Sequence, residues 1–190
     1  PDRPSKGRLG LGVGRGFSPI EPWYYGADPA HRQKFYLETR QILRQALTSR
    51  TLTFHGEFYD YADIPMELEP FQKPHPPFWI AATNTPETFA FAATNACKVM
   101  AIPLDPPKMR DLIGTYRDAW RKAGHTGNGH VMNTFFMCCA PNRDEAMAVG
   151  LGPCNTHLKG LADAAKEWLT GASTKDYPGY DKLMAHVLSD

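Results

Sequence analysis

The chain has 190 residues, of which 42% are hydrophobic and 22% are charged, a composition typical of a folded globular domain with a sizeable core. Its formal net charge is +1 and it holds no long run of lysine or arginine, so we expect it to bind neither nucleic acid nor an anionic membrane. No stretch approaches the roughly 20 apolar residues of a membrane span, and the first residues lack the apolar core of a signal peptide. The sequence therefore predicts a soluble, cytoplasmic protein.

The cysteines and histidines show no spacing typical of a metal site. Neither a CxxC nor an HExxH pattern occurs, so we expect no zinc site and no disulfide framework. We interpret the cysteines as reduced thiols in the core; they are Cys97, Cys138, Cys139 and Cys154.

The first half of the chain predicts one strand, one helix and a small hairpin. Leucine and valine alternate with glycine over residues 8–14, which is the period of a strand. Asp28 followed by Pro29 is typical of the N-cap and the first residue of a helix. Residues 52–61 hold two aromatic-rich arms around one glycine, which favours a hairpin that forms a surface flap.

The second half alternates strands with helices. Strands are predicted over residues 78–82, 98–102 and 130–140. A helix follows each of them and begins after a capping residue: Thr85, Asp105 or Asn142. Because residues 78–82 are wholly apolar, we expect that strand to be buried on both faces.

This order of elements predicts an α/β fold with a parallel sheet. The sheet is either open and doubly wound or closed into an eight-stranded barrel, and in both forms ligands bind at the carboxyl ends of the strands. A barrel takes about 250 residues, so a chain of 190 residues would hold only part of one.

The glycines of the first strand do not form the dinucleotide-binding fingerprint GxGxxG. The sixth position counted from Gly10 is Arg15, and the sixth counted from Gly12 is Phe17. The prolines that follow also prevent a helix from starting at once, as that fingerprint requires.

Two interpretations of the glycines remain open. Gly10, Gly12 and Gly14 share one face of the strand, so they can leave room for a flat ligand, and Arg15 at the strand end can hold its phosphate. Alternatively, the glycines relieve crowding inside a barrel, and Arg15 pairs with a carboxylate such as Glu21 or Glu38.

The turn after residues 78–82 is a second candidate site. Thr83, Asn84, Thr85 and Thr88 lie at the start of a helix, where hydroxyl and backbone N–H groups can bind an anion. The alternative is that Thr85 only caps the helix.

Four segments in register resemble the bacterial luciferase-like flavin monooxygenases: "SKGRLGLGVGRGF", "YYGADPAHRQKFYLE", "FHGEFY" and "PHPPFWIAATNTPET". The resemblance covers roughly residues 2–140. It implies a (β/α)8 TIM-type barrel, here partial, in which residues 8–14 are the fourth strand and residues 78–140 hold the fifth to seventh. We accordingly expect residues 1–190 to be a single partial barrel domain.

The resemblance also implies an enzyme and its cofactor. Members of the family use reduced FMN, or reduced deazaflavin in related branches, and FMN-dependent members use it with O2 to oxidise a small organic substrate. A separate flavin reductase supplies reduced FMN, and we expect a homodimer. The alternatives are a deazaflavin-dependent oxidoreductase and a non-catalytic barrel subunit.

The resemblance further implies which residues bind the cofactor. Arg15 would contact the flavin phosphate and Gly14 would lie near the reactive edge of the ring, where luciferases proper have a cysteine. The family's catalytic histidine lies on an earlier strand, so no catalytic acid or base is assigned here. The expected cofactor-binding residues are Gly14, Arg15, Gly16, Ala82, Thr83, Asn84 and Thr88.

Overall fold

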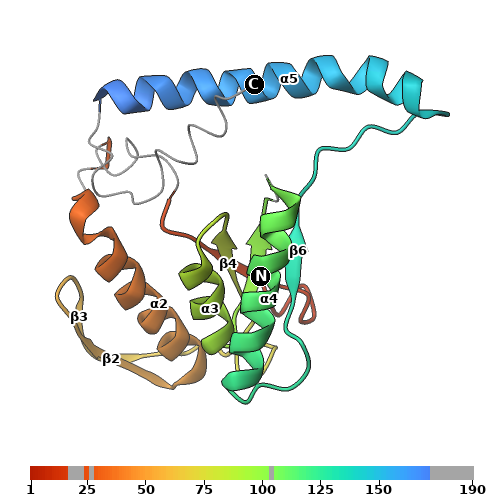
Figure 1. The fold of residues 1–190 in the computed structure, drawn as a ribbon. Helices are drawn as coiled ribbons and strands as arrows, with labels where there is room; N and C mark the ends of the chain where they lie inside the picture. Colours follow the sequence, from red (N-terminus) through yellow and green to blue (C-terminus); the bar gives the residue numbers. More distant parts are fainter. Residues whose placement is uncertain (17–23, 26–27, 103–104, 172–190) are drawn as a thin grey trace.

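A four-stranded parallel sheet forms the centre of the molecule (Figure 1). The computed structural model describes residues 1–16, 24–25, 28–102 and 105–171. The strands lie in the order β1-β4-β5-β6, and all three pairings are parallel. Their bounds are Leu11–Val13 for β1, Phe78–Ala82 for β4, Lys98–Ala101 for β5 and Val131–Asn133 for β6. The predicted α/β fold with a parallel sheet is confirmed.

Two helices cover one face of this sheet and enclose the core. They are α3 (Pro86–Thr94) and α4 (Pro106–Lys122), and the predicted starts of both are confirmed. Proline at the first turn suits a helix start because its missing N–H would have no partner there. The core between helices and strands includes Phe78, Ile80, Phe89, Val99, Leu112 and Tyr116.

The opposite face of the sheet is not covered by helices of the described chain. Trp79 is half-buried and Ala81 is exposed, whereas Phe78 and Ile80 on the helical side are 3% exposed. The prediction that residues 78–82 are buried on both faces is therefore wrong for this structure. The strand has an apolar residue at each position, yet only alternate side chains face the two helices.

Two strands are shorter than predicted because their ends have no pairing partner. Residues 8–10 precede β1, and the segment opposite them contains Pro76 and Pro77, which lack an N–H group. At the other edge, the N–H of Thr134 donates to the carbonyl oxygen of Ala101 at 2.9 Å. Ala101 is the last residue of β5, so residues 135–140 have no neighbouring strand and leave the sheet.

Between β1 and β4 the chain forms a helix and a hairpin. The short 3-10 helix η1 (Pro29–His31) leads into α2 (Arg32–Thr48), so the predicted start of α2 is three residues early. Asp28 caps η1 instead, because its Oδ1 accepts the N–H of Ala30 at 2.9 Å.

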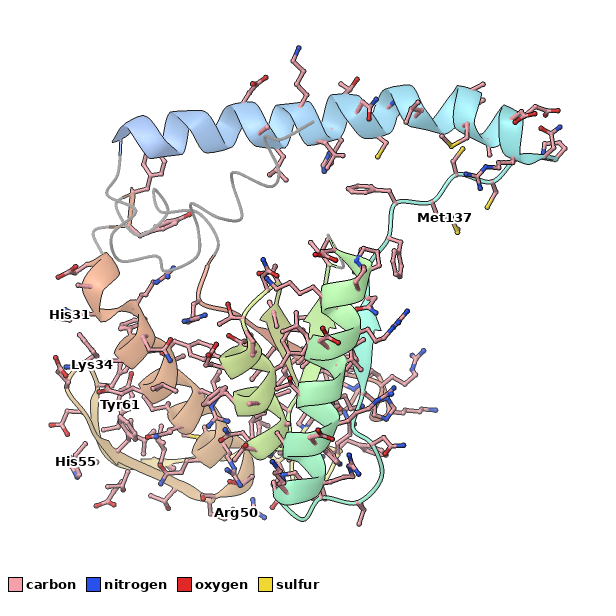
Figure 2. All side chains as sticks on the ribbon, viewed as in Figure 1. His31, Lys34, Arg50, His55, Tyr61 and Met137 are labelled. Atoms are coloured by element: carbon pink, nitrogen blue, oxygen red, sulfur yellow. The ribbon has the colours of Figure 1, made fainter. Side chains whose placement is uncertain are left out.

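The predicted hairpin is confirmed and is longer than expected. It consists of β2 (Thr51–His55) and β3 (Asp60–Pro65). Its turn is attached to α2, because Glu38 accepts the N–H of Glu57 at 2.7 Å and that of Phe58 at 3.1 Å. Lys34, also on α2 (Figure 2), donates to Glu57 Oε2 at 2.9 Å.

The last described helix, α5 (Arg143–Gly171), lies apart from the sheet (Figure 1). Its predicted cap is confirmed, since the N–H of Glu145 donates to Asn142 Oδ1 at 3.0 Å. Residues 134–142, including Met137 (Figure 2), connect β6 to α5. No helix within the described ranges is both long and apolar enough to cross a membrane.

The cysteines are not all in the core, so that prediction is wrong for three of them. Cys97 is buried, Cys138 and Cys139 are exposed, and Cys154 is half-buried. The exposed pair lies on the segment that leaves the sheet after β6.

Candidate functional site

The carboxyl ends of β1 and β4 meet at one edge of the sheet. Leu11 pairs with Phe78 and Val13 with Ile80. Because the strands are parallel, residues 14–16 and residues 83–84 both follow at this edge, as the sequence predicted. The candidate site consists of these two segments and the helices that begin beside them.

Gly14 and Gly16 leave the backbone open on either side of Arg15. A Cβ on Gly14 would lie 3.7 Å from the Cβ of Ala81, which is an ordinary contact, and no other recorded atom is as near. Gly16 has a φ of +80°, a conformation that glycine adopts without strain. This strand end therefore has room for a ligand close to the backbone.

Deeper in the strand, the glycines instead make room for neighbouring side chains. A Cβ on Gly10 would lie 2.8 Å from Nε1 of Trp79, and one on Gly12 would lie 3.1 Å from Cε of Met100. At these two positions the interpretation that glycine relieves crowding is correct, and the interpretation that it admits a flat ligand is wrong. Gly14 is the one glycine of the strand where the ligand interpretation still fits.

Arg15 has an exposed side chain whose charge no carboxylate of the described residues neutralises. Its Nη1 donates to Oε1 of Gln33, on the first turn of α2, at 2.7 Å. Glu38, one of the two expected partners, accepts backbone N–H groups of the hairpin instead. Glu21, the other, lies outside the described residues. A neutral amide thus orients the guanidinium and leaves its positive charge available to an anion.

Tyr36 adds a second polar group on the same helix. Its hydroxyl is buried and has no hydrogen-bond partner among the described residues. Burial raises the pKa of Tyr36, while the positive charges of Arg40 and Arg15 act in the opposite direction. The phenol therefore stays protonated at neutral pH and keeps a proton to donate.

The second segment offers fewer side chains than the sequence predicted. Thr83 and Asn84 are half-buried at the strand end. Ala82 is 6% exposed and belongs to the core, so its side chain points away from the site and only its backbone could contribute. Thr88 is half-buried, and its N–H donates to the carbonyl oxygen of Thr85 at 3.0 Å.

The start of α3 is less favourable to an anion than expected. Thr85 occupies the N-cap, but its side chain makes no capping hydrogen bond, so the prediction of simple side-chain capping is wrong. Glu87 lies in the first turn, where a carboxylate already offsets the positive end of the helix dipole. The first turn of α2 carries no acidic residue. Sequence reasoning missed both Gln33 and Glu87, because each becomes relevant only through its position beside the strand end.

Two curated relatives match parts of the chain. An uncharacterized protein of Sinorhizobium fredii is 43% identical over 101 residues, which are 53% of this chain and 29% of that protein. The oxygenase component of flavin-dependent trigonelline monooxygenase from Acinetobacter baylyi is 29% identical over 122 residues, 62% of this chain and 33% of that protein. The matched segments thus cover about a third of the length of these relatives.

Three solved structures share the fold. Monooxygenase RslO1 from Streptomyces bottropensis has a TM-score of 0.71 and 25% identity, and the match covers 97% of this chain and 54% of that one. The oxygenating constituent of 3,6-diketocamphane monooxygenase from Pseudomonas putida, in complex with FMN, has a TM-score of 0.72, 20% identity and coverages of 92% and 53%. An F420-dependent secondary alcohol dehydrogenase has a TM-score of 0.63, 18% identity and coverages of 95% and 52%.

These likenesses confirm an α/β fold similar to the luciferase-like TIM barrels, of which this chain spans about half. The family model described as luciferase-like monooxygenase matches residues 2–185. The chain therefore belongs to the luciferase-like monooxygenase family.

Proposed function

We propose that residues 1–190 form part of one barrel domain of the oxygenase component of a two-component flavin monooxygenase. Reduced FMN, delivered by a separate reductase, would be used with O2 to oxidise a small organic substrate. The observation that carries the proposal is the guanidinium of Arg15, whose charge no carboxylate of the described residues neutralises and which lies between two glycines at the carboxyl end of a parallel strand. The Acinetobacter relative, named as an oxygenase component, supports it.

The residues at this edge of the sheet fit a flavin phosphate. Arg15 would hold the phosphate by charge-assisted hydrogen bonds, and the open backbone at Gly14 and Gly16 would let the cofactor approach closely. The side chains of Thr83 and Asn84 would hydrogen-bond from the β4 side, together with the backbone of Ala82. Bound reduced FMN would supply the electrons that activate O2.

Thr88 has a smaller part in this proposal. It is the third residue of α3, directly after Glu87, and its N–H already donates to the carbonyl oxygen of Thr85. Only its hydroxyl remains to reach the phosphate. We therefore assign the phosphate mainly to the β1 strand end.

A second candidate is a deazaflavin-dependent oxidoreductase. The observation that favours it is the fold shared with an F420-dependent alcohol dehydrogenase. Both cofactors carry a phosphate at the end of the same ribityl chain, so the Arg15 site suits either of them. A non-catalytic subunit would bind neither.

The experiment is a fluorescence titration of the chain with FMN, with riboflavin, which lacks the phosphate, and with a deazaflavin. We expect Arg15→Ala to weaken FMN binding about ten- to a hundredfold, the usual value of a hydrogen bond to a charged group, and to leave riboflavin binding unchanged. Arg8 is the matched control, because it is an exposed arginine that precedes the other end of β1, and Arg8→Ala should bind FMN as the unaltered chain does.

Three outcomes would count against the proposal or redirect it. Equal affinity for FMN and riboflavin would mean that the phosphate contributes nothing to binding, and would contradict the proposed phosphate site. FMN binding that is unaffected by Arg15→Ala would place the phosphate elsewhere. Saturable binding of the deazaflavin alone would favour the second candidate.

A further inference from the structure

Three acidic side chains near the start of α2 are engaged away from Arg15. Glu38, the one acidic residue in the sequence of α2, accepts two backbone N–H groups of the hairpin turn. Glu57, in that turn, forms an ion pair with Lys34 at 2.9 Å. Asp28 caps η1. These three carboxylates therefore leave the positive charge of Arg15 in place.

Gln33 holds the guanidinium of Arg15 without cancelling its charge. A guanidinium has only donors, so the 2.7 Å contact with Nη1 identifies the amide oxygen Oε1 as the acceptor. Glutamate has the same shape as glutamine and could make the same contact, but with a full negative charge. Gln33 is exposed, so packing does not decide between the two residue types. The difference between them at this position is charge.

The molecule has the opposite residue type at the equivalent position of a second helix. Gln33 is the second residue of α2, and Glu87 is the second residue of α3. Each helix begins beside a strand end of the candidate site, where the positive end of the helix dipole favours an anion. The carboxylate of Glu87 offsets that end of α3, whereas the first turn of α2 has no acidic residue. The neutral residue thus lies on the helix that contacts Arg15.

We propose that Gln33 determines the specificity of the flavin site, because its neutral amide positions Arg15 and leaves the charge of Arg15 free to select flavins that carry a phosphate. Gln33 acts through Arg15, so it is a positioning residue. The inference rests on the proposed function, since it takes Arg15 as the group that holds the phosphate. An acidic residue at position 33 would instead pair with Arg15 and repel the phosphate.

The test is a fluorescence titration of the unaltered chain and its variants with FMN and with riboflavin. Gln33→Glu adds a negative charge at the contact, and Gln33→Met removes the amide without adding a charge. Gln41→Glu is the matched control, because Gln41 is also exposed on α2. It lies two turns, about 12 Å, farther along the helix, where salt largely screens its charge from Arg15.

The expected results separate charge from shape. Gln33→Glu should weaken FMN binding about tenfold, because the new ion pair competes for hydrogen bonds to a charged group, and should leave riboflavin binding unchanged. Gln33→Met should weaken FMN binding about threefold or less, because only a neutral hydrogen-bond partner is lost. Gln41→Glu should bind both flavins as the unaltered chain does.

Salt dependence gives a readout that a purely structural role of Gln33 would not change. FMN binding to the unaltered chain should weaken as salt is raised from about 20 to about 200 mM, because salt screens the attraction between Arg15 and the phosphate. Binding to Gln33→Glu should weaken less, because the site then has less positive charge to screen.

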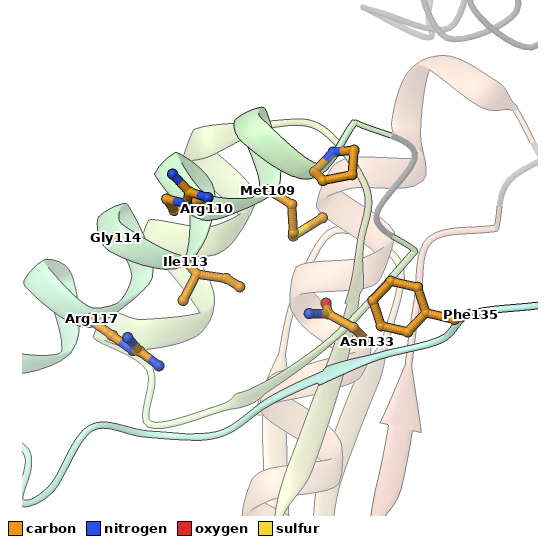
Figure 3. Close-up of a pocket in the computed structure, with 8 residues that line it drawn as sticks. Met109, Arg110, Ile113, Gly114, Arg117, Asn133 and Phe135 are labelled. Atoms are coloured by element: carbon orange, nitrogen blue, oxygen red, sulfur yellow. The ribbon is translucent and has the colours of Figure 1, made fainter.

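Arginines also line a pocket between α4 and β6, the strand at the opposite edge of the sheet from β1 (Figure 3). They are Arg110 and Arg117. A phosphate bound there would depend on these arginines and not on residue 33. Arg117→Ala, at an exposed position, should therefore leave FMN binding unchanged. A loss of FMN affinity in this variant, with none in Gln33→Glu, would place the phosphate in that pocket and overturn the inference.

The outcomes distinguish failure of this inference from failure of the proposed function. If Arg15→Ala weakens FMN binding and Gln33→Glu does not, the phosphate site stands and the role of Gln33 is refuted. That role is also refuted if Gln33→Met weakens FMN binding as much as Gln33→Glu does, or if Gln33→Glu weakens riboflavin binding equally. If Arg15→Ala leaves FMN binding unchanged, or if the unaltered chain binds no FMN, the proposed phosphate site fails and the inference fails with it.

Discussion

Gly10→Ala tests whether the glycines of β1 make room for neighbouring side chains. The new Cβ would lie 2.8 Å from Nε1 of Trp79, closer than real Cβ contacts come, and 3.0 Å from Cδ1 of the same ring, which is tighter than most of them. Crowding of this kind typically costs about 1–3 kcal/mol. Alanine in place of glycine recovers about 0.5–1 kcal/mol of chain entropy. We therefore expect a net loss of up to about 2.5 kcal/mol of unfolding free energy, the cost of crowding less the recovered entropy.

Gly14→Ala is the matched control on the same face of the same segment. Its Cβ would meet only the Cβ of Ala81, at 3.7 Å, and neither glycine has a positive φ. The control should be as stable as the unaltered chain or slightly more stable. Urea denaturation followed by far-ultraviolet circular dichroism measures both, with the difference read from the midpoints at equal slope.

A double variant identifies the source of the loss. Trp79→Leu removes the ring that the new methyl group would meet, so Gly10→Ala should cost less in that background, and the coupling free energy measures the contact. If Gly10→Ala is as stable as Gly14→Ala, or if the loss is the same with and without Trp79, the steric explanation is refuted.

Three further predictions concern the core and the thiols. Tyr116→Phe should cost about 1–3 kcal/mol in urea denaturation, because the buried hydroxyl donates to the carbonyl oxygen of Cys97 at 2.9 Å. Burial also raises the pKa of Tyr116. Unfolding free energy should therefore fall as pH rises above about 10, where the unfolded phenol ionises and the folded one does not, and fall less in the variant. Arg40→Ala should lower the urea midpoint of unfolding, because the guanidinium donates to Oδ1 of Asn95 at 2.7 Å. Arg40→Lys should lower this midpoint less, because lysine keeps the charge and a hydrogen-bond donor. A disulfide reagent should label Cys138 at once but Cys97 only on unfolding, because burial raises the pKa of the Cys97 thiol and shields it.

The sequence predicted the elements whose signals are local. The apolar run of β4 and the starts of α3 and α4 were all foreseen, because capping residues and proline act within one turn. Asp105, for example, accepts the N–H of Lys108 at 3.2 Å. Arg15 could likewise be placed at a strand end from the glycine pattern alone, since it directly follows the strand in the chain.

Features that depend on distant partners could not be predicted in this way. The lengths of β1 and β6 depend on where the neighbouring strands begin and end, which alternation of residue types does not encode. The hydrogen bond from Arg15 to Gln33 joins residues 18 positions apart. The need for glycine at position 10 likewise depends on a distant residue, because the Trp79 ring occupies the space that a Cβ would take. Glu87 could be seen in the sequence three residues after Asn84. Its unfavourable effect on anion binding could not, because that effect depends on α3 beginning next to the end of β4.

The attachment of the hairpin to α2 has a consequence for the order of folding. The hydrogen bonds of the hairpin to Glu38 join residues 19 and 20 positions apart. The contacts of the first residues are much longer in range: β1 pairs Leu11 with Phe78, and the N–H of Gln72 donates to Asp2, 70 positions away. Closing the longer loop costs more chain entropy and slows the step that depends on it. We expect α2 and the hairpin to form first and β1 to join last, so that in pulse-labelled hydrogen exchange the amides of residues 51–65 gain protection before those of residues 11–13.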